Sequence, residues 1–250
     1  MIVRFEDVGF RRGDARPVLT GLTLTIESGE IVAVVGRSGV GKTTLLKLVN
    51  RLLLPTTGTV LIDGRDSREW DGIRLRRRIG YVFQDVGLFP HMSVEDNVTV
   101  VPRLERWTPA KARARAHDLL GLVGLPPESF AARRPDELSG GQRQRVGLAR
   151  ALAADPPVLL MDEPFGALDP VTRLEVRREF QRIHRQLHMT AILVTHDMAE
   201  AFALGDRVGV IDEGELVACD TPAVVAASTD PRVRALVETI ARPPAAIDAT

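Results

Sequence analysis

The chain has little cysteine or lysine and no excess charge of either sign. Cys219 is the single cysteine among 250 residues, so no disulfide can form within the chain, and this suits a reducing compartment. Lysine occurs only at positions 42, 47 and 111, and arginine carries nearly all of the positive charge. Lys and Arg number 33, as do Asp and Glu, so no basic excess points to a nucleic-acid partner.

Long apolar runs are lacking too. No stretch approaches the roughly 18 apolar residues of a membrane span, and the first residues lack the pattern of a secretory signal. The hydrophobic content of 44% and the charged content of 26% are ordinary for a soluble globular protein with a sizeable core. We therefore expect the chain to act at a membrane only through a partner.

Residues 31–48 predict a strand, a glycine-rich loop and a helix. The run 31–35 is apolar and β-branched, as in a strand buried on both faces. Residues 36–43, Gly-Arg-Ser-Gly-Val-Gly-Lys-Thr, match the phosphate-binding pattern G-x-x-x-x-G-K-[ST] in full. A chance match in a chain of this length is roughly a 1% event, which argues against a glycine-rich turn of no function. The stretch therefore predicts binding of a nucleoside triphosphate.

The spacing within this loop suits the chemistry of a triphosphate. Glycines let backbone N–H groups converge on phosphate oxygens at the positive end of the following helix. Lys42 supplies a positive charge for the β- and γ-phosphates, and the Thr43 hydroxyl is a ligand for Mg²⁺. The predicted nucleotide-binding residues here are Gly36, Arg37, Ser38, Gly39, Val40, Gly41, Lys42, Thr43 and Thr44.

Two further apolar strands are predicted to end in polar residues, where α/β sheets place their ligands. The strand 80–84 ends in Gln84, which can touch Mg²⁺ or the attacking water; a surface glutamine is the alternative. The strand 158–163 ends in two carboxylates. Asp162 can hold Mg²⁺ through water, and strand alternation turns Glu163 in another direction, where it can polarise a water for attack.

The stretch 86–155 predicts helices, and one of them begins at a second candidate anion site. Ser139 occupies an N-cap position, so Ser139, Gly140 and Gly141 present a hydroxyl and free N–H groups at a helix start. A plain helix cap with a glycine turn is the alternative. Farther along, a strand over 191–195 is followed by His196, which is placed to sense a γ-phosphate, although a lone histidine can also be structural.

Other elements complete the predicted architecture. Alternating residues predict antiparallel strands over 2–5, 22–26 and 59–62. Helices are expected over 109–122, 171–187 and 232–240, and a hairpin over 207–218 with its turn at residues 213–214.

In this order the motifs resemble the ATP-binding subunit of ABC transporters, over nearly the whole chain from position 3 to about position 237. Residues 36–43 are similar to the Walker A loop, Gln84 to the Q-loop, 138–142 (through Gln142) to the LSGGQ signature, 158–163 to Walker B, Leu168 and Asp169 to the D-loop, and His196 to the switch histidine. The resemblance implies an α/β fold: a P-loop NTPase (RecA-like) core, an N-terminal antiparallel β subdomain and an inserted α-helical subdomain.

The implied organisation is a single ATPase domain over 1–240. Residues 1–85 and 156–222 would form the nucleotide-binding core with its antiparallel β subdomain. Residues 86–155 would form the helical subdomain with the signature, and 223–240 a C-terminal helix. We expect 241–250 to be a frayed tail.

The resemblance also implies a mechanism and partners. Two copies would pair head to tail, with each ATP·Mg²⁺ between one Walker A loop and the signature and D-loop of the other. Glu163 would act as general base, with His196, Gln84 and Lys42 as the other catalytic groups. The dimer would sit peripherally on the cytoplasmic face of the membrane, bound to integral permease subunits and linked indirectly to a substrate-binding protein, with no nucleic-acid partner.

One position departs from the family pattern. The family usually stacks an aromatic residue of the first sheet on adenine, and Arg12 occupies that position here. Either the Arg12 guanidinium stacks on the base, or Phe10 substitutes for the missing ring.

Within the family, the chain most resembles importers of quaternary-amine osmoprotectants such as glycine betaine, choline and carnitine. The stretches that carry this resemblance are 50–58, 62–64, 79–92, 153–157 and 165–170. Many such subunits carry a C-terminal pair of regulatory CBS domains, whereas this chain ends at Thr250 without them, so ionic-strength sensing of that type is not carried over. The alternatives are transport of another solute or a lipid, a soluble ABC ATPase outside transport, and a regulatory module without turnover.

The apolar stretch 86–98, which includes Phe89, follows Gln84 directly. We interpret it as the lining of a groove that receives a short coupling helix of the membrane subunit. Ordinary packing within the helical subdomain is the alternative.

Overall fold

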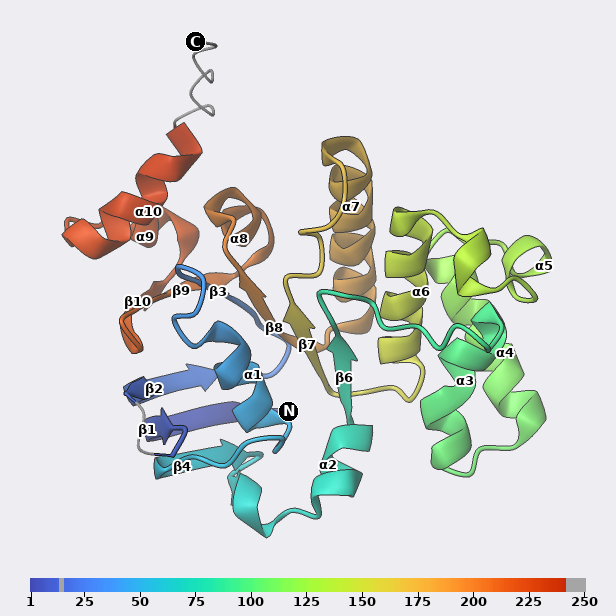
Figure 1. Ribbon diagram of the computed structural model, residues 1–250, viewed down its shortest axis with the longest axis horizontal. Helices are drawn as coiled ribbons and strands as arrows, with labels where there is room; N and C mark the ends of the chain where they lie inside the picture. The colour runs from blue at the N-terminus through green and yellow to red at the C-terminus, as the bar shows by residue number, and fades with distance from the viewer. Residues whose placement is uncertain (14–15, 242–250) are drawn as a thin grey trace.

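The computed structural model describes residues 1–13 and 16–241, in which a six-stranded sheet forms the centre (Figure 1). Its strands run in the order β10 (Glu215–Asp220), β9 (Arg207–Asp212), β3 (Ile31–Val35), β8 (Thr190–Thr195), β7 (Val158–Asp162) and β6 (Ile79–Val82). All neighbours are parallel except β10, which pairs antiparallel with β9. The carboxyl ends of β3, β8, β7 and β6 therefore meet at one edge of the sheet.

The strands of this sheet consist of continuous apolar runs, and both faces of the sheet are buried. Alternate residues of β3, Val32 and Val34, pack in one core with α1 (Lys42–Val49) and the antiparallel sheet. The residues between them, among them Ala33, pack in a second core with the helices α6 (Gly140–Leu152), α7 (Pro170–Leu187) and α8 (Met198–Leu204). The residues of the central strands β3 and β8 are buried throughout, as parallel strands covered on both faces require.

The antiparallel sheet has the order β2 (Pro17–Ile26), β1 (Val3–Arg11), β4 (Thr57–Ile62) and β5 (Arg65–Asp66). The predicted strands 2–5 and 22–26 were too short. The alternation on which they rested is interrupted because β1 carries irregular register after Phe5 and Asp7 has a positive φ of 49°.

Four helices form the predicted helical region beside β6 (Figure 1). They are α3 (Val94–Leu104), α4 (Pro109–Leu122), α5 (Pro127–Phe130) and α6 (Gly140–Leu152). Before them lie the 3₁₀ turn η1 (Ser67–Glu69) and α2 (Gly72–Arg77), and a second 3₁₀ turn, η2 (Pro135–Glu137), precedes α6.

The last third of the chain closes the second face of the sheet. The predicted long helix is α7 (Pro170–Leu187), and the hairpin β9–β10 turns at Glu213 and Gly214, both with positive φ. Helix α8 (Met198–Leu204) was not predicted. The C-terminal helix expected over 223–240 is divided into α9 (Pro222–Ala226) and α10 (Pro231–Ala241). The tail expected over 241–250 lies outside the described residues from position 242. Within the described ranges, no helix combines the length and the apolar character needed to cross a membrane.

Candidate nucleotide-binding and catalytic site

The phosphate loop connects β3 to α1 with its shape set by glycines. Gly41 has a φ of 113°, and a Cβ there would lie 2.7 Å from the Leu19 side chain, so this position excludes other residues. A Cβ on Gly36 would lie 2.4 Å from the carbonyl oxygen of Ile211. No side chain caps the N-terminus of α1, so its first N–H groups face the loop and can bind an anion.

Lys42 folds back onto this loop. Its ammonium donates hydrogen bonds to the carbonyl oxygens of Gly36 at 2.7 Å and Arg37 at 3.0 Å, and the residue is only 5% exposed. Burial lowers the pKa of Lys42, while the nearby carboxylates Glu163 and Asp162 act in the opposite direction. The cation therefore lies within reach of both acids at the end of β7.

Hard oxygen donors for Mg²⁺ meet beside this lysine. The Thr43 hydroxyl donates to Asp162 Oδ1 at 3.0 Å, although the two residues are 119 positions apart. Tyr81 on β6 donates to the other oxygen, Oδ2, at 3.3 Å. Burial raises the pKa of Asp162, and the hydrogen bonds from Thr43 and Tyr81 oppose the shift. A hydroxyl and a carboxylate in this arrangement fit Mg²⁺, which prefers oxygen ligands.

Glu163 and His196 form a second pair at the same edge. His196 Nδ1 lies 2.9 Å from Glu163 Oε2, and the histidine side chain is more than half exposed. The strand predicted to include Glu163 ends at Asp162 instead. Glu163 has a left-handed φ of 45°, and its N–H bonds to the carbonyl of Val194 on β8. The different direction of the two acids therefore comes from this turn, not from strand alternation.

Gln84 lies farther out than predicted. Strand β6 ends at Val82, and Gln84 follows two residues later in an irregular, exposed segment. No hydrogen bond among the described residues holds its amide. The sequence placed this residue at a strand tip, whereas the structure places it in the connection to α3.

The signature residues and Asp169 occupy helix starts. Ser139 caps α6: its Oγ accepts from the Gln142 N–H at 3.2 Å, and its own N–H donates to Gln142 Oε1 at 2.9 Å. Gly140 is exposed, whereas a Cβ on Gly141 would lie 2.3 Å from a methyl of Thr172 on α7. Asp169 caps α7 by accepting from the N–H groups at positions 171 and 172. Ser139, Gly140 and Asp169 are exposed, whereas Gly141 is buried against α7.

Comparison with known proteins identifies the family of this site. The ABC transporter family model matches residues 19–166, which is more than half of the chain. The chain belongs to the ABC transporter family.

Two curated relatives and one solved structure illustrate the similarity. The osmoprotectant import ATP-binding protein OsmV of Salmonella typhimurium is 47% identical over 212 residues, which cover 85% of this chain and 56% of the relative. The glycine betaine/carnitine/choline transport ATP-binding protein OpuCA of Bacillus subtilis is 47% identical over 221 residues, covering 88% of this chain and 58% of the relative. The chain thus spans a little over half the length of these relatives.

The solved structure is a dimer of the ATP-binding cassette MJ0796 in a post-hydrolysis state with ADP and Pi. It has a TM-score of 0.78 and 33% identity, and the match covers 88% of this chain and 98% of that one. The prediction of an α/β ABC ATPase fold, with an antiparallel β sheet and a helical region, is confirmed.

The two candidates for adenine stacking differ in availability. Phe10 is 9% exposed and belongs to the core beneath the antiparallel sheet, so its ring packs against the protein. Arg12 is exposed just past β1. The packing of Phe10 therefore favours Arg12 as the contact, which stays a prediction.

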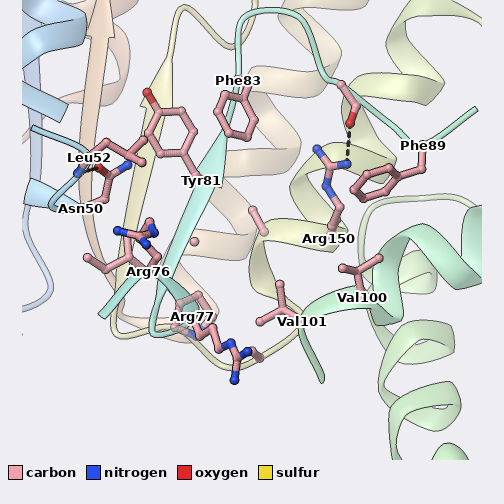
Figure 2. A pocket seen from close by; sticks show the side chains of 16 residues that line it. Asn50, Leu52, Arg76, Arg77, Tyr81, Phe83, Phe89, Val100, Val101 and Arg150 are labelled. Atoms are coloured by element: carbon pink, nitrogen blue, oxygen red, sulfur yellow. Dashed lines mark hydrogen bonds between the residues drawn. The ribbon is translucent and has the colours of Figure 1, made fainter. Parts of the chain in front are cut away.

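A groove lies beside the Q-loop of this ABC chain, between β6 and the helical region (Figure 2). It has a volume of about 410 Å³. Leu52, Phe83 and Phe89 line it with exposed apolar side chains, and Arg76 and Arg77 stand along it. Among the residues from positions 86–98, this groove is lined by Gly87 and Phe89, whereas Val94 and Val98 are buried in the core. Val94 and Val98 therefore fit the packing alternative, and docking of a coupling helix beside Phe89 stays a prediction.

Sequence reasoning missed three groups that support this site. Tyr81 stacks on Phe83, with ring centroids 4.2 Å apart, while its hydroxyl reaches Asp162. Glu200, 3% exposed, accepts from the hydroxyl of Thr195, the residue next to His196. Arg150 contacts the segment after Gln84. Tyr81 and Arg150 connect residues far apart along the chain, whereas Thr195 and Glu200 are only five positions apart. Only the position of Tyr81 in a strand next to β7 offered a signal.

Proposed function

We propose that the chain is the ATP-hydrolysing subunit of an ABC importer for a quaternary-amine osmoprotectant such as glycine betaine. The observation that carries the proposal is the meeting of two pairs, Thr43 with Asp162 and Glu163 with His196, at one sheet edge beside the phosphate loop. The names of the curated relatives support the substrate class. The activity of the whole assembly, its substrate and its partners are all part of this proposal.

Each residue has a chemical role in the proposed reaction. The loop N–H groups and Lys42 bind the β- and γ-phosphates, and Thr43 and Asp162 would hold Mg²⁺, which neutralises phosphate charge when bound. Glu163 orients a water and accepts its proton as the water attacks the γ-phosphorus; the bond from that phosphorus to the β,γ-bridging oxygen breaks, and ADP leaves. His196, hydrogen-bonded to that carboxylate, orients it and donates toward the γ-phosphate oxygens. Gln84 contacts the water or the metal ion once its segment moves inward.

A second copy would complete the site. Ser139 and Gly140 are exposed at the start of α6, so we assign the group 139–141 to the γ-phosphate bound by the partner copy. This arrangement is in keeping with the dimeric cassette to which the chain is similar. Asp169 lies in the loop that would run along the same interface.

The groove beside the Q-loop is the proposed docking site for the permease subunit. The permease would hold the chain peripherally at the cytoplasmic face of the membrane. Phe89 is 41% exposed on its rim. Phe89→Asp should prevent co-purification with permease subunits, whereas Val224→Asp on α9, a site 54% exposed and outside the groove, should not. Co-purification of the Phe89→Asp variant with permease subunits would count against this docking site.

The test of the catalytic proposal uses two glutamate–histidine pairs of the same chain. Glu163→Gln should abolish Mg²⁺-dependent ATP hydrolysis and trap an ATP-bound dimer. Glu95 forms an equivalent pair with His117, at 2.8 Å, in the helical region, and Glu95→Gln should leave turnover in place. Full turnover by the Glu163 variant would refute the assignment of the base.

The substrate is tested in cells. Labelled glycine betaine uptake by salt-stressed cells lacking other betaine transporters should occur with the wild-type chain and disappear with Glu163→Gln. Uptake that is independent of the chain, combined with normal ATP hydrolysis, would remove the osmoprotectant assignment and leave the ATPase in place.

A further inference from the structure

The segment that carries Gln84 is anchored entirely by the helical region. Asn97 on α3, fully buried, accepts from the Phe89 N–H at 2.7 Å and donates to the Phe89 and Ser93 carbonyls. This anchor lies at least five residues beyond Gln84. Closer to Gln84, the segment depends on Val86 and Gly87, which contact α6.

Arg150 supplies the nearer anchor from the last turn of α6. Its Nη1 donates to the Gly87 carbonyl at 2.8 Å, and its Nη2 donates to the Val86 carbonyl at 2.5 Å. Figure 2 shows the guanidinium facing this backbone beside Phe89, in the wall of the groove. On the preceding turn, Gly147 lets Val86 approach so closely that a Cβ there would lie 2.4 Å from the Val86 methyl.

The guanidinium is committed to this contact. Arg150 has no carboxylate partner within 4.0 Å among the described residues. Burial lowers its pKa, although an arginine remains charged at any physiological pH. A partly buried cation whose donors end on two neighbouring carbonyls fixes the geometry of those peptides, because removing it would leave both acceptors without a partner.

We propose that Arg150 is a positioning residue for Gln84. Arg150 thereby links the groove beside Gln84 and helix α6 to the end of the site where Mg²⁺ and the attacking water would bind. The same helix carries Ser139 at its start and Arg150 eleven residues later, about 16 Å along the axis. A partner that presses on Phe89, or a second copy that moves Ser139, therefore shifts Gln84 through a single rigid element. This inference rests on the proposed function.

The first experiment is a double-mutant cycle on ATP hydrolysis by the full chain. Arg150→Met should lower kcat by about tenfold to a hundredfold, as expected for a misplaced catalytic group, and leave the KM for ATP nearly unchanged. Added to Gln84→Ala, Arg150→Met should cause little further loss, because its effect passes through Gln84. Additive losses would overturn the proposal.

Two further variants separate positioning from general stability. Arg145 on the same helix donates to the Val123 carbonyl at 2.9 Å, within the helical region, and Arg145→Met should leave kcat unchanged. Gly147→Ala pushes Val86 away without removing a charge and should reproduce the loss in kcat, so the test survives if the Arg150 variant fails to fold. An equal loss in kcat from Arg145→Met would also overturn the proposal.

Hydrogen–deuterium exchange gives a readout that needs no activity. Arg150→Met should speed exchange of the Phe89 amide, which is hydrogen-bonded to Asn97 at the end of this segment, several-fold, and Arg145→Met should not. Absence of ATP hydrolysis in the wild type would refute the proposed function, and the exchange rates would still decide the role of Arg150. Unchanged exchange of the Phe89 amide would refute that role.

Discussion

Glu200 makes the stability of this chain fall as pH rises, and Glu200→Gln should remove the effect. Burial raises the pKa of this carboxyl from 4.5 to about 7, and the negative charge of Asp197 adds to the rise. The hydrogen bond from Thr195 and the positive charges of Arg177 and Arg173 lower the pKa but do not cancel the effect of burial. Below pH 4.5 the group is neutral in both the folded and the unfolded chain. As pH rises toward 7, the unfolded chain ionises first, so folding loses stability.

The loss is sizeable. A rise from 4.5 to about 7, at 1.36 kcal/mol per pH unit, corresponds to about 3 kcal/mol of unfolding free energy once the pH exceeds the folded pKa. Glutamine keeps an oxygen that can accept from Thr195 and cannot ionise. Any cost of its amide group is the same at every pH, so the pH dependence isolates the carboxyl.

Urea unfolding at pH 5, 6, 7 and 8 measures the effect. The difference in unfolding free energy, Glu200→Gln minus wild type, should increase by about 2.5 kcal/mol between pH 5 and pH 8, because part of the loss has already occurred at pH 5. Glu128→Gln, at an exposed position in α5, serves as the control and should show a flat difference. A flat difference for Glu200→Gln as well would refute the reasoning.

Three other substitutions test the site. Gly41→Ala should weaken ATP binding at least tenfold, measured with a fluorescent nucleotide. Gly64 also has a positive φ but has open space around it, so Gly64→Ala should not weaken binding. Equal losses of affinity in the two variants would contradict a steric cause. Thr43→Val should raise the Mg²⁺ concentration needed for half-maximal hydrolysis, and Thr43→Ser should restore it; a valine variant with normal Mg²⁺ dependence would remove Thr43 from the metal site. Asn97→Ala should cost about 3 kcal/mol in urea unfolding because several backbone groups lose their partner, and a loss below about 1 kcal/mol would contradict that anchoring.

Much of this molecule could be predicted because its motifs are local. The strand over 31–35, the phosphate loop and the cap at Ser139 each depend on neighbours within a few residues, and all three were placed correctly. The wider fold followed from the order of the motifs. The ends of strands were less predictable, because β1 continues through a bulge that breaks the alternation, and Glu163 leaves its strand by a left-handed turn.

Contacts between distant segments could not be predicted from patterns. Arg150 reaches carbonyls more than 60 positions away, and nothing in an arginine-rich helix singles it out. Glu200 lies in a short helix that the sequence did not reveal, and its burial depends on how α8 packs under the sheet. Such residues are set by tertiary packing, whose information is spread over the whole chain.

The hydrogen bonds from Lys42 to its own loop affect how the nucleotide affinity of this chain should be interpreted. Two of the three N–H bonds of its ammonium are donated to carbonyl oxygens of the loop, so the loop itself competes with phosphate for the lysine. A triphosphate exchanges these bonds for phosphate contacts, and its measured binding energy is the difference between the two sets. Variants that weaken the internal set, without touching any phosphate contact, should therefore bind nucleotide more tightly than the wild type.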